Sequence, residues 1–180
     1  SITAVTAIHV NVDNKNVVFA EGEHSTVNVY NLGTIDANQA LLVTGDANVN
    51  VYNEGDLTGN VTTGDGDDFF YNRPDDALSR AGKITLTDQS IDLGGGQNEF
   101  RNTFGDIVFS GDSSILVGVD GVVNNYSQTI NYATVSSVNE QAGDTLTIDG
   151  DVNFITNCTN TGLVVLETST TTTDQIIIGG

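Results

Sequence analysis

The residues most suited to chemistry lie in one acidic turn, Thr63-Gly-Asp-Gly-Asp-Asp-Phe-Phe70. Its two glycines, Gly64 and Gly66, allow the backbone to turn tightly and to point carbonyl oxygens inward. Asp65, Asp67 and Asp68 supply negative charge, and carboxylates this close together repel one another without a cation. Calcium takes about six to eight hard oxygen ligands, both carbonyls and carboxylates. The turn therefore predicts a calcium site.

The spacing Gly-x-Gly-x-Asp, followed by Phe69, resembles the glycine- and aspartate-rich nonapeptide of the RTX (repeats-in-toxin) calcium β-roll family. Residues 94–100 and 44–49 are looser versions of the same motif. In that family, consecutive nonapeptides stack and calcium bridges neighbouring turns. The motifs here are not in tandem, which favours a larger solenoid with occasional calcium sites. The metal ligands that the resemblance implies are Gly64, Asp65, Gly66, Asp67, Asp68, Asp46, Asn48 and Asn98.

A short repeat indicates which elements hold these turns. The pattern apolar-Asn-apolar-Tyr-Asn occurs as Val27-Asn-Val-Tyr-Asn31 and as Val49-Asn-Val-Tyr-Asn53. Weaker copies begin at Val10, Asp68, Asn98, Val123 and Val152. Apolar residues alternate within the copies, which is typical of a half-buried strand. Further strand-like runs separate the copies, so each unit of about 20 to 30 residues predicts one coil of a β-solenoid.

The composition agrees with stacked strands and sharp turns. Val, Ile, Thr and Tyr favour strands, whereas Gly, Asn and Asp favour turns. The net charge of −19 is high, but a hydrophobic content of 38% is enough for a packed core. We predict an all-β fold, a parallel β-solenoid similar to a β-helix or β-roll, with about seven irregular coils forming one domain over residues 1–180. Residues 75–81 are at most a short helical turn.

The recurring asparagines and tyrosines have structural interpretations. The asparagines that precede or begin turns are Asn31, Asn53, Asn72 and Asn102. We expect turn positions for them, because Asn tolerates left-handed backbone angles. Asn28 and Asn50 lie in mid-strand and are better candidates for a ladder of side-chain hydrogen bonds between coils. The aligned tyrosines are Tyr30, Tyr52, Tyr71 and Tyr126. They predict an aromatic stack, with packing favoured over a carbohydrate platform.

Charge and cysteine content exclude several classes of partner. There are 24 acidic and only 5 basic residues, so nucleic-acid binding is excluded, because it needs basic side chains to neutralise phosphates. No apolar run approaches the length of a membrane span. Cys158 is the single cysteine, which rules out an intrachain disulfide and favours a small buried thiol. No secretory signal peptide is visible at Ser1, so export would depend on prior processing or on a signal elsewhere.

No catalytic residues stand out. A glycoside hydrolase needs two facing carboxylates, and no such pair can be identified among so many acids. A polysaccharide lyase needs a basic residue beside an acidic sugar, which this acidic chain would repel. We therefore expect no enzyme, with these two activities as the remote alternatives.

The ends of the chain favour assembly. A solenoid has open ends with unpaired backbone groups, and the apolar, β-prone terminal strands at 1–12 and 163–180 have no obvious polar cap. We expect a secreted, extracellular or cell-surface structural protein that associates with copies of itself into a calcium-stabilised fibre, surface layer or matrix. Calcium would also promote folding of the acidic chain. The alternative is an adhesin or fibre domain that binds glycans or a receptor.

Overall fold

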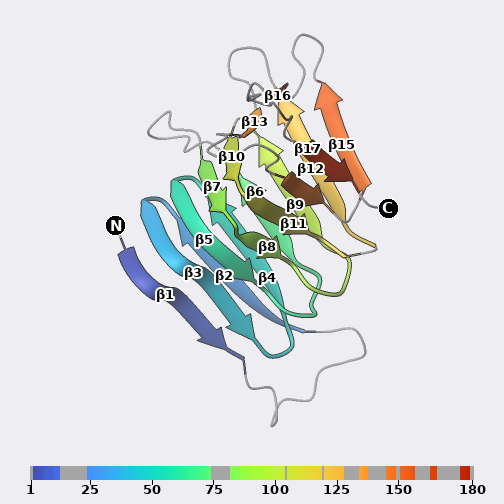
Figure 1. Ribbon diagram of the computed structural model, residues 1–180. Coiled ribbons are helices and arrows are strands. Elements are labelled where there is room, and N and C mark those ends of the chain that lie inside the picture. The colour runs from blue at the N-terminus through green and yellow to red at the C-terminus, as the bar shows by residue number, and fades with distance from the viewer. Residues whose placement is uncertain are drawn as a thin grey trace.

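The structure is a computed structural model in which all the described strands pair in parallel. It describes residues 2–12, 24–73, 82–103, 105–118, 120–127, 134–137, 145–148, 151–156, 163–165 and 175–178. Cys158, the possible helical turn at 75–81 and parts of the 163–180 terminal segment lie outside these residues. The described strands stack coil upon coil from the N-terminal end to the C-terminal end (Figure 1).

Two parallel sheets form the walls of the stack. The first contains β1 (Ile2–Asn11), β3 (Thr34–Thr44), β5 (Asp56–Thr62), β7 (Lys83–Thr87), β8 (Ser90–Asp92), β10 (Asp106–Ser110), β11 (Asp112–Leu116), β13 (Thr134–Ser137), β14 (Thr145–Ile148), β16 (Leu163–Val165) and β17 (Gln175–Ile178). The second contains β2 (Ser25–Asn31), β4 (Ala47–Asn53), β6 (Phe69–Asn72), β9 (Glu99–Thr103), β12 (Val122–Ser127) and β15 (Asp151–Thr156). The chain alternates between the sheets, so the predicted all-β, parallel β-solenoid is confirmed.

The first sheet divides part of the way along the solenoid. In the N-terminal coils, β1, β3 and β5 each cross the wall as one continuous strand. One half of β5 then pairs with β7 and the other half with β8. The later coils continue as two rows of short strands separated by a corner. Asp88 forms this corner with a positive φ of 50°, and its Oδ1 accepts a hydrogen bond from the Asp112 N–H (3.0 Å). The solenoid therefore changes from two walls to three.

The strand register corrects three members of the sequence repeat. The copy that begins at Val10 is wrong as a member of this series, because Val10 pairs with Val43 in the first sheet. The copy that begins at Val123 is shifted by two residues, because Asn125 lies opposite Asn102. The copy at Val152 shares this shift, because Val152 pairs with Val123. The copies at Val27, Val49, Asp68 and Asn98 stack in the second sheet as the sequence predicted.

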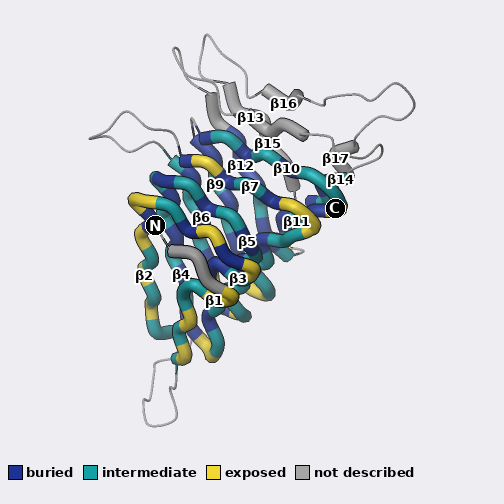
Figure 2. The backbone as a smooth tube through the Cα atoms, turned by 60° about the vertical axis from the view of Figure 1, so that its left-hand side comes forward, coloured by how far each residue is buried: buried dark blue, intermediate teal, exposed yellow. Residues whose placement is uncertain are grey.

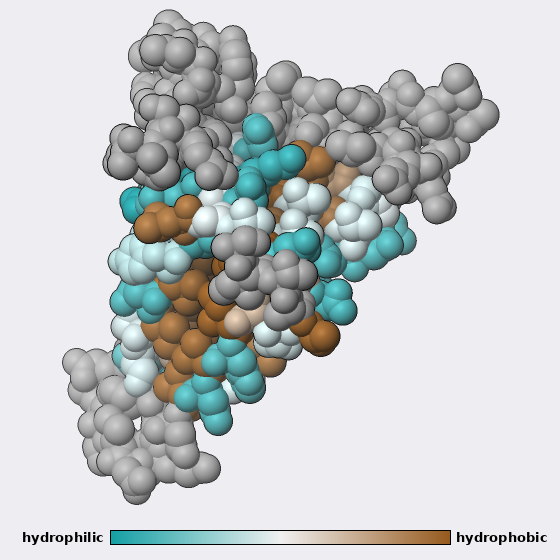
Figure 3. All heavy atoms as spheres, turned by 90° about the vertical axis from the view of Figure 1, so that its left-hand side faces the viewer, coloured by the Kyte–Doolittle hydropathy of each residue, from teal (hydrophilic) through white to brown (hydrophobic). Residues whose placement is uncertain are grey.

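The core is an apolar column inside the coils. Burial alternates along the strands, as in β4, where Val49 and Val51 point inward and Asn48 and Asn50 are part-exposed. Figure 2 shows this alternation along the stacked coils. Phe70 and Phe100 of successive coils are fully buried and stacked, with ring centroids 5.1 Å apart. At the N-terminal end, the described apolar residues of the column are only partly buried, and Figure 3 shows an apolar patch with polar residues around it.

A buried asparagine ladder joins five coils where the second sheet turns into the first. Its members are Asn31, Asn53, Asn72, Asn102 and Asn125. Each Nδ2 donates to the next Oδ1, at 2.7 to 2.8 Å. Asn31 also accepts a hydrogen bond from the Gly33 N–H, which fixes the turn. The turn prediction for these residues is therefore right in placing them where strands lead into turns, but wrong in its reason, because none of them has the left-handed backbone angles that were expected. The predicted Asn50–Asn28 bond is present as well, at 3.1 Å on the outer face.

Candidate functional site

The acidic turns lie at the opposite edge of the solenoid, where the first sheet leads into the second. Gly45, Gly64, Gly94 and Gly118 stack there, each with a positive φ, between 68° and 106°. A Cβ on Gly94 would lie 1.6 Å from the Gly64 carbonyl oxygen. These glycines are required because each turn packs directly onto the backbone of the turn before it. Part of the Gly-x-Gly signal is therefore explained by stacking alone.

Asp68 and Asn98 face the interior and bind backbone groups of neighbouring coils. Asp68 is only 2% exposed, and its Oδ1 accepts a hydrogen bond from the Val49 N–H (2.7 Å). Its own N–H donates to Asn98 Oδ1 (2.9 Å). Asn98 Nδ2 is directed at backbone carbonyls, including those of Leu93 (3.1 Å) and Val117 (3.0 Å). The Asp68 side chain thus ties its coil to the preceding one, and the Asn98 side chain ties its coil to the coils on both sides.

Asn48 and Asp67 make the same kind of connection nearer the surface. The Asp67 N–H donates to Asn48 Oδ1 (3.0 Å), and the Gln97 N–H donates to Asp67 Oδ1 (2.8 Å). The four residues Asn48, Asp67, Asp68 and Asn98 therefore form a turn latch, in which side-chain oxygens accept backbone hydrogen bonds across coils. Sequence analysis identified all four but expected them to bind a metal.

The latch contains one energetically unfavourable group, the buried carboxylate of Asp68. Asp68 Oδ2 and Thr63 Oγ1 are buried, and neither has a hydrogen-bond partner among the described residues. Burial raises the pKa of Asp68 from its ordinary 3.8 to about 6, and repulsion from Asp67 and Asp65 acts in the same direction. The nearby Thr63 hydroxyl and the Val49 N–H oppose this shift, although Thr63 is not in hydrogen-bond geometry. Asp68 therefore carries its charge at neutral pH at a cost to stability.

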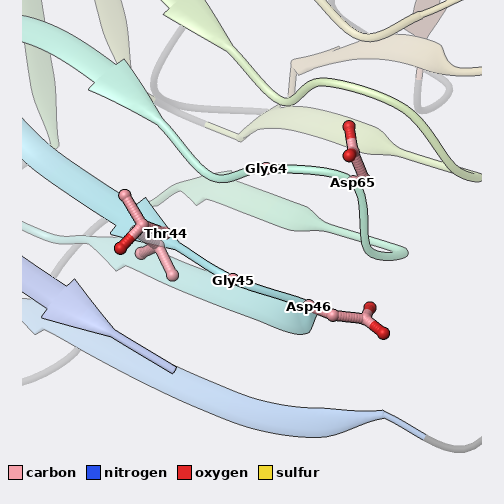
Figure 4. A pocket seen from close by; sticks show the side chains of 6 residues that line it. Thr44, Gly45, Asp46, Gly64 and Asp65 are labelled. Atoms are coloured by element: carbon pink, nitrogen blue, oxygen red, sulfur yellow. The ribbon is translucent and has the colours of Figure 1, made fainter. Parts of the chain in front are cut away.

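Two predicted ligands remain on the outside, and we call them the acidic edge: Asp46 and Asp65. They flank a hollow that is also lined by Val43, Thr44, Gly45 and Gly64. Figure 4 shows that the two carboxylates project from successive turns and point in different directions. Asp46 Oδ1 also lies 2.7 Å from His24 Nδ1, while its side chain is 65% exposed. The hollow thus offers two carboxylates beside glycine backbone.

The fit to calcium differs between these two groups. In the latch, one side-chain oxygen of each residue accepts a backbone N–H, while Asp68 Oδ2 is buried with no hydrogen-bond partner among the described residues. Most of these donors are therefore already used within the protein. The acidic edge has exposed hard oxygens from two coils, which is the donor type that calcium prefers. Within the described residues, no group of three or more His, Cys, Asp and Glu side chains could hold a metal ion. Of the predicted ligands, Asp46 and Asp65 therefore have the carboxylates best suited to a calcium ion. Neighbouring carbonyls and water would have to complete its coordination shell.

A second polar surface lies on the outer face of the second sheet. Tyr30 and Tyr52 are stacked, with ring centroids 4.9 Å apart and an interplanar angle of 11°. Phe69 packs against Tyr71 at 5.6 Å. The predicted tyrosine stack is therefore present for one pair and interrupted by Phe69. The side chain of Tyr126 lies outside the described part of the chain.

Two arginines lie on these rings. The Arg73 guanidinium is 5.1 Å from the centroid of Tyr52, and that of Arg101 is 5.1 Å from Phe69. Arg73 is paired with Glu54, and Arg101 Nε donates to Glu99 Oε1 (2.8 Å). We call this set the aromatic–arginine row. The aligned rings were predicted from the repeat, but the contacts of the arginines with them were not, because only the coil register places these side chains next to one another.

The fold and the turns define the class of this protein, a parallel β-solenoid with acidic, glycine-rich turns. Its sequence matches no family model, and no curated protein or solved structure matches it. The RTX likeness therefore remains a resemblance carried by the turn residues. Among the described residues, no helix is long and apolar enough to cross a membrane.

Proposed function

We propose that this chain is an extracellular structural protein, a β-solenoid that self-associates into a fibre, surface layer or matrix and binds calcium at its acidic edge. The supporting observation is that its recurring polar residues are used to join coils. The asparagine ladder and the turn latch both direct their hydrogen bonds along the solenoid axis. Such a design suits a stiff scaffold, because each coil is fixed to its neighbours at two edges.

The negative charge of the chain supports the calcium part of the proposal. The chain carries a net charge of −19, and Asp46 and Asp65 lie on successive turns of one edge. Bringing such carboxylates together is unfavourable, and a divalent cation between them reverses the sign of that contribution. Calcium binding to the folded coils would then stabilise the fold by mass action. Millimolar extracellular calcium would be sufficient for a weak site of this kind.

Electron microscopy of purified protein with calcium and with chelator tests the assembly. We expect ordered fibres or sheets in calcium and fewer or none in chelator. Magnesium and sodium chloride at equal ionic strength are the controls, because simple screening of the −19 charge would also reduce repulsion. Protein that stays monomeric at high calcium contradicts the assembly. Equal assembly in all three salts contradicts the specific role of calcium.

Glycan or receptor binding is the second candidate, and the aromatic–arginine row favours it. Arg73 and Arg101 are two of only five basic residues, yet both lie on one outer face beside part-exposed rings. Arginine and aromatic side chains are common in recognition surfaces. A glycan array with Tyr52→Ala and Arg101→Ala tests this candidate, and Thr58→Ala on the first sheet is the control. Binding that survives both row variants would remove the row from consideration.

A further inference from the structure

The N-terminal end of the solenoid differs in character from the rest of its surface. Among the described residues, the exposed large hydrophobic side chains are Val5 (76%), Tyr30 (61%) and Leu32 (60%), and all three lie at this end. Beside them, Ile8, Val10, Val27 and Val29, together with Ala7 and Val12, are only partly buried against the core. Figure 3 views this face directly and shows the apolar patch that they contribute to.

The two strands at this end also lack the usual protection of sheet edges. Among the described strands, β1 pairs only with β3, and β2 is the outermost strand of its sheet. Exposed edges are normally guarded by charged residues or proline. Neither β1 nor β2 contains Asp, Glu, Lys, Arg or Pro, although the chain as a whole has a net charge of −19. The two described strands of this face therefore present a second copy with no charged side chain of their own to repel it.

The shape of the end favours the same end of another copy over its C-terminal end. β1 is one continuous strand of 10 residues. The last coil instead offers β16 with 3 residues and β17 with 4, with residues 166–174 between them in sequence. A head-to-tail contact would thus place a two-walled end against a three-walled one. A head-to-head contact joins two identical cross-sections.

The rise of the chain along the solenoid axis decides which strands of two copies can pair. The chain climbs by one strand spacing per coil, about 4.8 Å, so β1 lies about half a spacing beyond β2. Pairing β1 with β1 of the second copy would leave the two β2 strands about 10 Å apart, too far for backbone hydrogen bonds. If β1 of each copy instead pairs with β2 of the other copy, two equivalent pairs form. In both pairs the strands lie one strand spacing apart, close enough for backbone hydrogen bonds.

We infer that two copies of this chain associate through their N-terminal ends, with β1 of each copy in antiparallel pairing with β2 of the other. The two-fold axis runs parallel to the strands and between the two sheets, which makes the interface isologous. Strands in opposite walls run in opposite directions, so this rotation produces antiparallel ladders. The apolar columns of the two copies then meet and become one core. This inference rests on the proposed self-association and identifies one of its contacts, because an isologous contact closes a dimer and a fibre or layer needs a further contact elsewhere on the chain.

Analytical ultracentrifugation of wild type in calcium provides the first test, and a concentration-dependent dimer is expected. The disruptive variant is Thr6→Glu with Thr26→Glu, two exposed positions of β1 and β2. We expect its dimer dissociation constant to rise by about tenfold or more, because like charges would face each other across the contact. Thr87→Glu with Ser114→Glu adds the same charge away from this end and should dimerise as wild type. Circular dichroism checks that both double variants are folded.

Cross-linking then tests the strand pairing. In a Cys158→Ser background, β1 variants with one cysteine at Thr6, His9 or Asn11 are oxidised alone and in mixture with Thr26→Cys. Disulfide dimers should form in the mixtures and only weakly in each variant alone. Dimers that form equally with β1 cysteines alone overturn the inference. Assembly that persists unchanged in Thr6→Glu with Thr26→Glu also overturns it but leaves the proposed function intact. A wild type that never associates overturns both.

Discussion

The two edges of this solenoid both join neighbouring coils through side-chain hydrogen bonds, but they use different chemical groups. At one edge the asparagine ladder joins five coils with neutral amides, each of which donates to the next. At the other edge the turn latch uses carboxylates as well as amides, and it leaves Asp68 Oδ2 and Thr63 Oγ1 buried without hydrogen-bond partners in the described part of the chain. The hydrogen bonds of a neutral amide ladder do not depend on pH, whereas a latch that contains carboxylates responds to pH. The first edge supplies constant stability, and the second makes stability conditional.

The comparison also explains where each edge ends. The ladder stops at Asn125, whose Nδ2 has no partner among the described residues, because Phe154 occupies the next position in register. The glycine stack continues to Gly118, where a Cβ would lie 2.9 Å from the Gly94 carbonyl oxygen. Both edges are therefore continuous over the same central coils, which is where variants should separate their contributions.

The largest expected effect is that of Gly94→Ala. The new Cβ would overlap the Gly64 carbonyl oxygen at 1.6 Å, and φ at this position is +68°. We expect a loss of more than about 3 kcal/mol in the free energy of unfolding, because backbone rather than a flexible side chain must move. Urea unfolding measures it. The matched control is Gly95→Ala, whose Cβ has no contact shorter than 3.5 Å and should cost less than about 1 kcal/mol. Equal losses would show that turn stacking is not tight.

Asn72→Ala should have the second-largest effect on the free energy of unfolding. It removes the donor to Asn102 Oδ1 and the acceptor of Asn53 Nδ2 in the middle of the ladder. Leaving buried polar groups without partners costs about 1 to 3 kcal/mol each, so we expect a loss of about 2 to 4 kcal/mol in urea unfolding. Asn28→Ala removes one exposed hydrogen bond to Asn50 and should cost no more than about 0.5 kcal/mol. A small loss at Asn72 would mean that water replaces the missing amide.

Asp68→Asn should change the pH dependence of stability. The folded-state pKa of Asp68, about 6, lies above the ordinary value of 3.8. Its protonated form therefore contributes stability that is complete below about pH 4 and is lost as pH rises through about 6. A shift of this size corresponds to about 3 kcal/mol. The amide keeps the acceptor for the Val49 N–H and removes the charge.

We therefore expect Asp68→Asn to be more stable than wild type at pH 8, by about 1 to 3 kcal/mol, and similar to it near pH 4. Measuring the difference between the two proteins at each pH cancels the titration of the other acids. Asp92→Asn, at a part-exposed position of the same edge, is the control. A difference that stays constant from pH 4 to pH 8 would show that Asp68 does not titrate in this range.

The smallest expected effect is that of Asp65→Asn, and it concerns calcium. Without calcium, removing one exposed charge from the acidic edge should leave stability nearly unchanged or slightly raised. In calcium, a tenfold weaker site would lower the added stabilisation by about 1.4 kcal/mol. Thermal unfolding with calcium and with chelator measures the difference. Asp36→Asn, an exposed acid on β3, has the same charge change and should retain the full calcium response. If calcium stabilises both variants equally, calcium does not bind at the acidic edge.

Much of the local structure could be predicted from the sequence. Alternation around Val27–Asn31 and Val49–Asn53 indicated strands, and the Gly-Asp clusters indicated tight turns. These features follow from short-range rules on side-chain direction and backbone angles. The chain's apolar content and repeat were enough to predict a parallel solenoid. The asparagines were correctly placed at or next to the strand ends that precede turns, but the left-handed backbone angles expected for them were wrong, because Asp88 is the one non-glycine residue with a positive φ in the described part of the chain.

What only the tertiary structure decided is which residues of different coils meet. Successive rungs of the ladder are separated by 22, 19, 30 and 23 residues, so no fixed period could have aligned Asn125 with Asn102. The same register turns Asp68 inward to the Val49 N–H while Asp65 stays outside, although both belong to one motif. Composition determines that this chain forms turns and strands. Long-range pairing, which depends on the length of every loop, determines which acids join the latch and which stay exposed at the surface.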